Sequence, residues 1–351
     1  MRSFEHVSWI SEITLGDRAH VGGKGGSLGE LHRAGIAVPP AFVVKTRAFE
    51  RFIEALEREA PVRARIEALS GEDLAAIIAC SRALRARLES AELPPEVRDE
   101  ICAAHAELCG RAGAPHAVAV RSSATTEDAT DASFAGLQDT YLWVRSPGDM
   151  LGKVRSCWAS LYSTESIAYR LKHGFPEESV AMAVVVQTMV DARAAGVMFT
   201  RSPTTGDRSV ITIEGAWGLG SAVVGGEVTP DRWVLGKITG EISVREISDK
   251  AIEHVPAPSG GIEAVAVAEE RRRVACVSDE ELQALRATAR SVERHYGRPQ
   301  DIEWAVDRHT GSILLLQSRP ETVWSQREAA PVARAADNPL AHVMSIFGGR
   351  R

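Results

Sequence analysis

The residues from Asp301 to Val323 alternate between apolar and polar types with the period of two that is typical of a β-strand. One face of this strand carries the apolar side chains Ile302, Trp304 and Val306, and the other carries Asp301, Glu303 and Ala305. A polar stretch that ends in a glycine, residues 307–311, predicts the turn of a hairpin. A second, almost wholly apolar strand is expected at Ile313–Leu316.

The end of this hairpin carries polar side chains that are costly to bury. Because a hairpin sets its strands side by side, Glu303 is expected to face Gln317 and Arg319. A carboxylate, an amide oxygen and a guanidinium suit a site for a metal ion and a phosphate group. The alternative is an edge hairpin with solvated polar residues. We favour the site, because Gln317 and Arg319 follow the apolar run directly.

The stretch from Asp17 to Leu31 is rich in glycine around Lys24, and a helical pattern is expected to begin at Ser27. Clustered glycines let a backbone approach a ligand closely, and a helix N-terminus offers N–H groups to an anion. The stretch matches neither the P-loop pattern, since Gly25 follows the lysine, nor the dinucleotide pattern, since position 28 is leucine. The alternative is a flexible turn with a solvated lysine.

The remainder of the first half predicts alternating strands and helices. We expect a strand at Ala41–Val44, three or four amphipathic helices between Thr46 and Gly113, a short strand at Ala117–Val120 and a helix over Asp149–Leu171. A boundary between two lobes is placed near residue 180.

Arg121 directly follows the strand at Ala117–Val120 and begins a small, polar stretch that runs to Gly136. Such a long loop is usually functional or disordered. Its Ser, Thr and Gly residues could wrap around phosphate oxygens beside the fixed charge of Arg121. The alternative is a plain surface loop.

The second half predicts a buried strand at Val180–Val190, interrupted by Gln187. A buried amide must find hydrogen-bond partners, which a docked base or the neighbouring backbone could supply. Further strands are expected at Gly196–Thr200, Val210–Glu214, Trp233–Leu235 and Glu241–Ile247. Ser278 and Glu281 form a capping box that predicts a helix ending near Tyr296. We expect the chain to divide into a first lobe of residues 1–180, a second lobe of residues 181–325 and a C-terminal tail of residues 326–351.

Composition narrows the class of protein. The 351 residues are 44% hydrophobic and 25% charged, with a net charge of -6, which gives no electrostatic footprint for nucleic acid. The longest apolar run, Ala181–Val186, is too short to span a membrane. Five cysteines without a CxxC pair are expected to be reduced, which indicates a cytoplasmic protein.

Several stretches in order resemble one family, and they cover residues 17 to 325. They include VGGKGGSLGEL, VAVRSSATTEDATDASFAGLQDTYL, VVVQTMV, AAGVMFTRSPTTGD, EGAWGLG, HYGRPQDIEW and LLQSRPETV. Together they resemble the nucleotide-binding part that phosphoenolpyruvate synthase shares with rifampin phosphotransferase and pyruvate phosphate dikinase. The resemblance implies a mixed α/β, ATP-grasp fold, in which two α/β lobes hold ATP between them.

The same resemblance implies roles for individual residues. The cations that bind the phosphates and serve catalysis would be Lys24, Arg121 and Arg319. A loop that closes over the phosphates would contribute Ser133, Gly136 and Thr140. The adenine and hinge region would be lined by Gln187, Met189 and Val190, with Glu214 near the adenosine. Mg²⁺ would be held by Glu303 and Gln317, and Asp301 would support the site. One departure is Gln300, where the family usually has methionine.

Members of the family pass phosphate through a histidine that follows a threonine and glycines, and none of the ten histidines here has that setting. We therefore expect the ATP-binding subunit of a split dikinase, similar to phenylphosphate synthase. Its phosphohistidine would lie on a separately encoded partner subunit that phosphorylates a small acceptor such as pyruvate or a phenol. The alternatives are a self-contained ATP-grasp enzyme that forms ADP, and a non-catalytic nucleotide-binding module.

Overall fold

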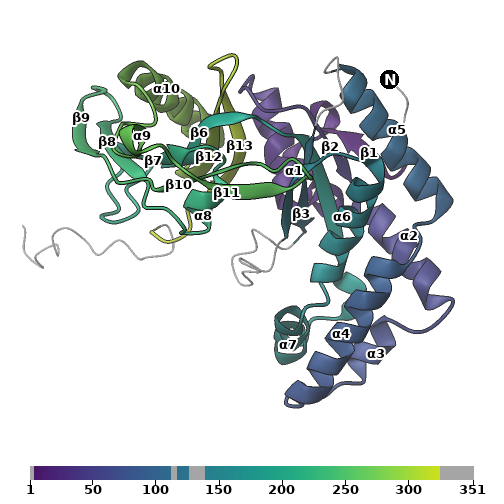
Figure 1. Ribbon diagram of the computed structural model, residues 1–351. Coiled ribbons are helices and arrows are strands. Elements are labelled where there is room, and N and C mark those ends of the chain that lie inside the picture. Colours follow the sequence, from purple (N-terminus) through teal and green to yellow (C-terminus); the bar gives the residue numbers. More distant parts are fainter. Residues whose placement is uncertain (1–3, 112–116, 126–138, 325–351) are drawn as a thin grey trace, which may run out of the picture.

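The computed structural model describes residues 4–111, 117–125 and 139–324 of the chain. These residues form two lobes that lie side by side (Figure 1). Each lobe is built on one antiparallel sheet, five-stranded in the first lobe and six-stranded in the second. Helices pack against both sheets, so the mixed α/β architecture predicted from the sequence is confirmed.

The first sheet contains three strands that are buried along almost their whole length. Its spatial order is β1 (Val7–Trp9), β2 (Ala41–Val44), β5 (Met182–Thr188), β3 (Val118–Ala124) and β4 (Thr140–Val144). β5 lies between β2 and β3 and pairs antiparallel with both. It therefore belongs to the first lobe, and the change of sheet falls between Thr188 and Ala192 rather than near residue 180.

Helices cover the first sheet and extend away from it at the foot of Figure 1. They are α2 (Thr46–Glu57), α3 (Arg63–Glu67), α4 (Leu74–Ser90), α5 (Pro95–Arg111), α6 (Pro147–Ser160) and α7 (Thr164–His173). The first four confirm the helices expected between Thr46 and Gly113. The single helix expected over Asp149–Leu171 is instead two, because the Ser163 hydroxyl accepts the Ser166 N–H and starts a new helix.

The glycine-rich stretch is helical, which corrects the loop expected before Ser27. α1 spans Arg18–Arg33, and only Gly22 (φ 70°, ψ 179°) departs from helical geometry within it. An added Cβ on Gly25 would lie 3.2 Å from the Val43 side chain, and one on Gly29 would lie 2.7 Å from Ile13. These glycines therefore let α1 pack closely against β2 and against Ile13, and the departure from helical geometry within α1 is confined to Gly22.

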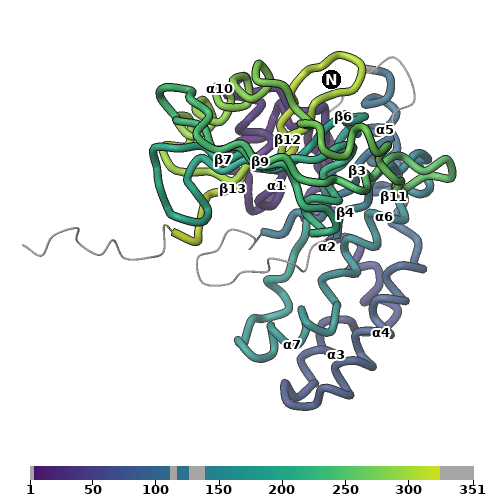
Figure 2. Tube along the Cα trace, turned by 60° about the vertical axis from the view of Figure 1, so that its left-hand side comes forward, coloured from purple at the N-terminus to yellow at the C-terminus, as the bar shows by residue number. Residues whose placement is uncertain are grey.

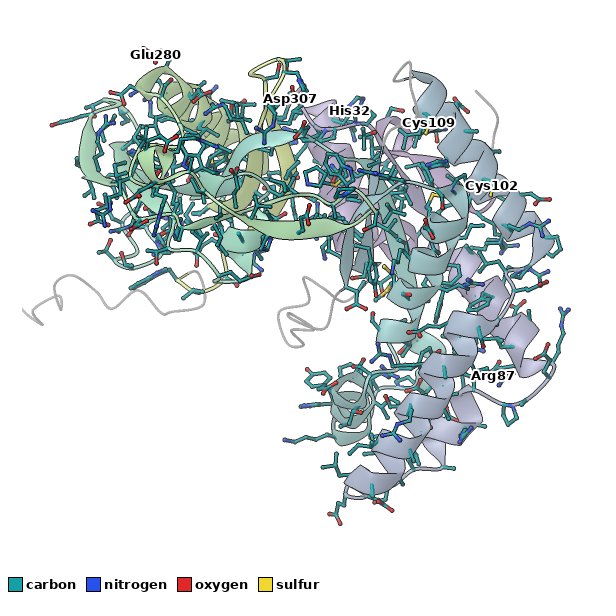
Figure 3. The ribbon with its side chains drawn as sticks, in the orientation of Figure 1. His32, Arg87, Cys102, Cys109, Glu280 and Asp307 are labelled. Atoms are coloured by element: carbon teal, nitrogen blue, oxygen red, sulfur yellow. The ribbon has the colours of Figure 1, made fainter. Side chains whose placement is uncertain are left out.

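The second sheet carries the hairpin that the alternating pattern predicts. Its order is β13 (Ile313–Pro320), β12 (Gln300–Asp307), β6 (Ala192–Phe199), β7 (Val210–Trp217), β8 (Asp231–Gly236) and β9 (Ile242–Glu246). Ile302, Trp304 and Val306 are buried in its core, as expected. Asp307 closes the turn, where its Oδ1 accepts the backbone N–H groups of His309 and Thr310 at 3.0 and 2.8 Å (Figure 3).

Helix α10 (Asp279–Tyr296) packs on this sheet and confirms the predicted capping box. The remaining short elements are α8 (Ser221–Val224), α9 (Glu269–Arg272), the paired strands β10 (Ile252–Pro256) and β11 (Ile262–Ala266), and the 3-10 turns η1 (Ile10–Glu12), η2 (Leu15–Asp17) and η3 (Glu177–Ser179). Within the described ranges, no helix is long and apolar enough to cross a bilayer.

Two elements cross from one lobe to the other. α1 contacts the second lobe, where the Ser27 hydroxyl donates to the Ser318 carbonyl at 2.6 Å and Leu31 enters the second core. The β10–β11 hairpin reaches back to the first lobe (Figures 1 and 2). The Arg145 guanidinium, just after β4, donates to the carbonyl oxygens of Ala257 and Pro258 at its tip.

The kink at Gly22 gives a test of the packing between α1 and β3. A Cβ on Gly22 would lie 2.1 Å from the Ser123 carbonyl oxygen, whereas one on Gly35, which has the same φ of 70°, would meet nothing within 4 Å. We expect Gly35→Ala to lower the free energy of unfolding by about 1 kcal/mol, through backbone strain alone. Gly22→Ala should cost at least about 2 kcal/mol more, because of the added overlap. Urea denaturation of both variants measures the difference, and equal losses would contradict it.

Candidate nucleotide site between the lobes

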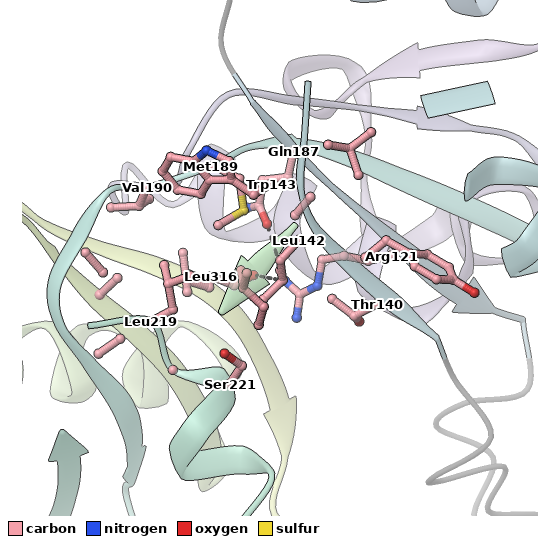
Figure 4. Close-up of a pocket in the computed structure, with 18 of the residues that line it drawn as sticks. Arg121, Thr140, Leu142, Trp143, Gln187, Met189, Val190, Leu219, Ser221 and Leu316 are labelled. Atoms are coloured by element: carbon pink, nitrogen blue, oxygen red, sulfur yellow. Dashed lines mark hydrogen bonds between the residues drawn. The ribbon is translucent and has the colours of Figure 1, made fainter. Parts of the chain in front are cut away.

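A cavity of about 780 Å³ lies between the two lobes, a volume typical of sites for small molecules (Figure 4). β3, β4 and β5 of the first lobe and β6, β12 and β13 of the second lobe supply lining residues. One end is apolar, with Met189, Val190, Leu219 and Leu316. The other end is polar and contains Arg121, Thr140 and Glu303.

Arg121 of β3 holds the polar end together. Its Nη2 donates to Glu303 Oε2 at 2.8 Å and to Gln317 Oε1 at 2.6 Å, both on the second lobe. Its Nη1 donates to the Leu316 carbonyl at 2.8 Å and to Gln187 Oε1 at 3.3 Å. The guanidinium is buried, so these acceptors replace the water that its charge has lost.

The β12–β13 hairpin places the four polar residues singled out in the sequence at one end. Glu303 pairs with Gln317 and Asp301 pairs with Arg319 in the strand register, so the predicted facing of Glu303 and Gln317 is confirmed. Burial raises the pKa of Asp301 to about 6, although the Arg319 guanidinium, at 3.3 Å, acts in the opposite direction. The Arg319 side chain is 60% exposed, so its charge is open to solvent.

Glu303 and Gln317 fit a small divalent cation. Their oxygen atoms converge on one nitrogen of Arg121, so they lie close enough together to contact one ion. A carboxylate and an amide carbonyl are hard oxygen ligands, and Mg²⁺ commonly takes one or two such ligands with phosphate and water for the rest. In the described parts of the chain, no three His, Cys, Asp or Glu residues are grouped as a metal site. Phosphate oxygens would therefore have to complete the coordination.

Gln187, Met189 and Val190 line the cavity where β5 leads into the second sheet. The prediction that Gln187 is buried in a strand is confirmed, and its amide oxygen accepts a hydrogen bond from Arg121. Its Nε2 is buried and has no hydrogen-bond partner among the described residues. This donor points to a ligand acceptor in the cavity, next to Arg121.

Thr140 lies beside Arg121, and Lys24 lies on α1, the helix that packs against β3. Thr140 lines the cavity and is the register partner of Arg121 across β3 and β4. Lys24 is buried in α1 and is not among the described lining residues. The Gly25 N–H next to it donates to the Ser123 hydroxyl at 3.1 Å, which fixes this part of α1 beside β3. Ser133 and Gly136 lie outside the described residues.

Glu214 is separate from this group. It lies on β7, pairs with Val197 of β6 in the register, and is not among the described lining residues. Burial raises the pKa of its carboxyl group, and the nearby Arg232 guanidinium lowers it. The glycines that follow it do reach the cavity, since Gly220 lines it.

Sequence reasoning missed Trp143 and Ser221, which also line the cavity. Trp143 lies in β4, a strand whose irregular pairing breaks the alternating pattern that would have revealed it. Ser221 follows Gly218-Leu219-Gly220, and its hydroxyl lies 2.8 Å from His254 Nδ1. The glycines before Ser221 were the one signal available for it.

The cavity combines an apolar end, a buried amide donor without a partner among the described residues, and a cationic end with two oxygen ligands. These features suit a molecule that has one flat apolar part and one anionic part. A nucleoside phosphate with a divalent cation has this combination. Phosphate oxygens that bind Nη1 or Nη2 of Arg121 would displace some of the present acceptors, because these two nitrogens already make four hydrogen bonds. The buried Nε of Arg121 has no hydrogen-bond partner among the described residues.

Comparison with known proteins agrees with this chemistry. Residues 18–338 match the family model of the pyruvate phosphate dikinase AMP/ATP-binding domain. The chain is 39% identical to a probable phosphoenolpyruvate synthase of Staphylothermus marinus, with 92% of this chain and 42% of that protein covered. It is 36% identical to a phosphoenolpyruvate synthase of Pyrococcus furiosus, with 95% and 46% covered. The chain thus spans less than half the length of these two relatives.

Among solved structures, this chain is similar to D-alanyl-alanine synthetase A of Vibrio cholerae, with 11% sequence identity and a TM-score of 0.26. The match covers 69% of this chain and 54% of the synthetase chain. The family match covers both lobes and the cavity between them, in accord with the ATP-grasp fold that the motifs imply. The chain belongs to the family of the pyruvate phosphate dikinase AMP/ATP-binding domain.

Proposed function

We propose that this chain binds ATP with Mg²⁺ in the cavity between its lobes and begins a dikinase reaction. The observation that carries the proposal is the convergence of Glu303 and Gln317 on Arg121, since Arg121 and Glu303 line the polar end of a cavity whose other end is apolar. The base would lie toward Gln187, Met189 and Val190, and the phosphates toward Arg121. Family membership supports the choice of an adenine nucleotide.

Three cations of the chain would share the negative charge of the triphosphate. Lys24 and Arg121 are held by the first lobe and Arg319 by the second, so the phosphates would bind across the junction. Glu303 and Gln317 would hold Mg²⁺, which neutralises phosphate charge when it is bound. In this scheme, Arg121 moves from the two metal ligands to phosphate oxygens, and Asp301 orients Arg319 through the contact between them.

The acceptor is proposed to be a histidine of a partner subunit. No histidine is among the described residues that line the cavity. The histidine nitrogen would attack the β-phosphorus, the bond from that phosphorus to the α–β bridging oxygen would break, and AMP would leave with the oxygen. Water then releases the γ-phosphate, and the partner passes the remaining phosphoryl group to a small acceptor such as pyruvate or a phenol. The chain need only position and stabilise charge, because a neutral imidazole nitrogen is already nucleophilic.

The product of ATP decides between this function and its rivals. We expect β-labelled ATP, incubated with this chain and the protein encoded next to it, to yield AMP and to leave the label on the partner. ADP formed without a partner would indicate a self-contained phosphotransferase. ATP binding without turnover in the presence of the partner would indicate a regulatory module.

The metal-ligand role of Glu303 can be separated from its role in folding. We expect Glu303→Gln to raise the Mg²⁺ concentration needed for half-maximal ATP binding by at least about tenfold, because a charged oxygen ligand is lost. Asp307→Asn is the matched control, since it removes a carboxylate from the other end of β12. Titration of Mg²⁺ at fixed ATP measures both, and an equal effect of the two substitutions would contradict the assignment.

Arg319 is expected to be needed for turnover but not for the fold. The guanidinium of Arg319 is exposed, so its pair with the half-buried Asp301 is expected to contribute only about 1 kcal/mol. Arg319→Ala should therefore leave the thermal midpoint nearly unchanged while abolishing AMP formation. Arg308→Ala is the control, because Arg308 forms a similar surface pair with Asp191 near the turn of the same hairpin. Near-normal turnover of the Arg319 variant would remove Arg319 from the site.

A further inference from the structure

Trp143 has a backbone conformation that calls for an explanation. Its φ is 56°, and every other residue with positive φ in the described ranges is a glycine. A bulky aromatic residue is a true outlier in this region, because its Cβ crowds the backbone. Such a conformation costs free energy and persists only where the surroundings hold it in place, which happens most often at ligand sites.

A β-bulge produces the unusual conformation. Val118 pairs with Val144 and Val120 pairs with Tyr141, so two residues of β4, Leu142 and Trp143, lie opposite the single residue Ala119. Bulges of this kind change the direction in which a side chain points and are frequent beside active sites.

Hydrogen bonds to the β10–β11 hairpin of the second lobe hold the bulge in place. The Trp143 carbonyl accepts the Gly261 N–H at 3.2 Å, and Arg145 binds the same hairpin tip through Ala257 and Pro258. The backbone of Trp143 is therefore fixed by a contact between the lobes, and not by its own sheet alone.

The bulge turns the indole toward the apolar end of the cavity. The ring is half-buried and packs against the apolar cluster that contains Val190 and Leu219, as Met189 and Leu316 also do (Figure 4). Gln187, whose Nε2 is buried and has no partner among the described residues, lines the same cavity. The cavity thus offers both an aromatic face and an unpaired hydrogen-bond donor.

We propose that the indole of Trp143 is the surface on which the nucleobase stacks, so that the first lobe recognises the base through β4. This inference rests on the proposed function, because it assumes that the ligand is a nucleotide. An aromatic ring attracts any flat base through its π-face, whereas Gln187 Nε2 can select a base by donating to one of its acceptor atoms. The free-energy cost of the strained backbone at Trp143 is then offset by tighter binding, because the ring already lies in the stacking position before the nucleotide binds.

The matched variants are Trp143→Phe and Trp143→Leu. Neither residue adopts positive φ more easily than the other, so backbone strain is the same in both, and only phenylalanine keeps an aromatic face. The probes are Mg·ATP and Mg·tripolyphosphate, which carries the same chain of phosphates without a base. We expect Trp143→Phe to bind ATP within about threefold of the original protein and Trp143→Leu to bind it on the order of tenfold more weakly. Both should bind tripolyphosphate normally in calorimetric titrations.

Equal ATP affinity of the two variants would overturn the stacking role and leave Trp143 as a packing residue. Parallel losses of ATP and tripolyphosphate affinity would do the same. If both variants fail to fold, the original protein decides the question: ATP should quench tryptophan fluorescence and tripolyphosphate should not, and an absence of ATP-specific quenching would overturn the proposal. Failure of the unaltered protein to bind either probe would instead contradict the proposed function itself.

Discussion

The guanidinium of Arg121 is the interaction on which the junction between the lobes depends. Its own strand lies in the first sheet, but three of its four hydrogen bonds end on the β12–β13 hairpin. Arginine stays charged at any ordinary pH, so a buried guanidinium must be given acceptors wherever it lies. The second lobe supplies those acceptors, and the closed arrangement follows from that need.

The same requirement for acceptors links the cavity to its proposed ligand. Glu303 and Gln317 accept hydrogen bonds from Arg121, and the guanidinium in turn supplies positive charge to them. A phosphate group that takes over the guanidinium leaves two oxygen atoms that need a new positive partner, and a divalent cation is one. Phosphate and metal are thus expected to favour each other's binding, because the phosphate would take Arg121 away from Glu303 and Gln317 and the cation would take its place beside them.

The sequence predicted those features that depend on neighbouring residues. The hairpin at residues 300–320 follows from alternation, and the facing of Glu303 and Gln317 follows from the hairpin. The α10 cap depends on two residues three positions apart. The position of β5 between β2 and β3 depends on partners far away in the chain, so the lobe boundary was misplaced. Glycine is favoured at positions 25 and 29 of α1 because Val43 and Ile13 leave little room there for a side chain. A local sequence pattern does not reveal these tertiary contacts.

Trp143 shows why a site can be harder to predict than a fold. Arg121 and Thr140 are register partners, and Trp143 follows on the same strand, so β3 and β4 serve both ends of the cavity. The bulge interrupts the strict alternation of side chains along β4, and both Thr140 and Trp143 line the cavity. The second lobe pins this bulge through Gly261 and Arg145. The hydrogen bonds between the lobes therefore help to place the indole, and under the proposed stacking role they would couple recognition of the base to closure of the site.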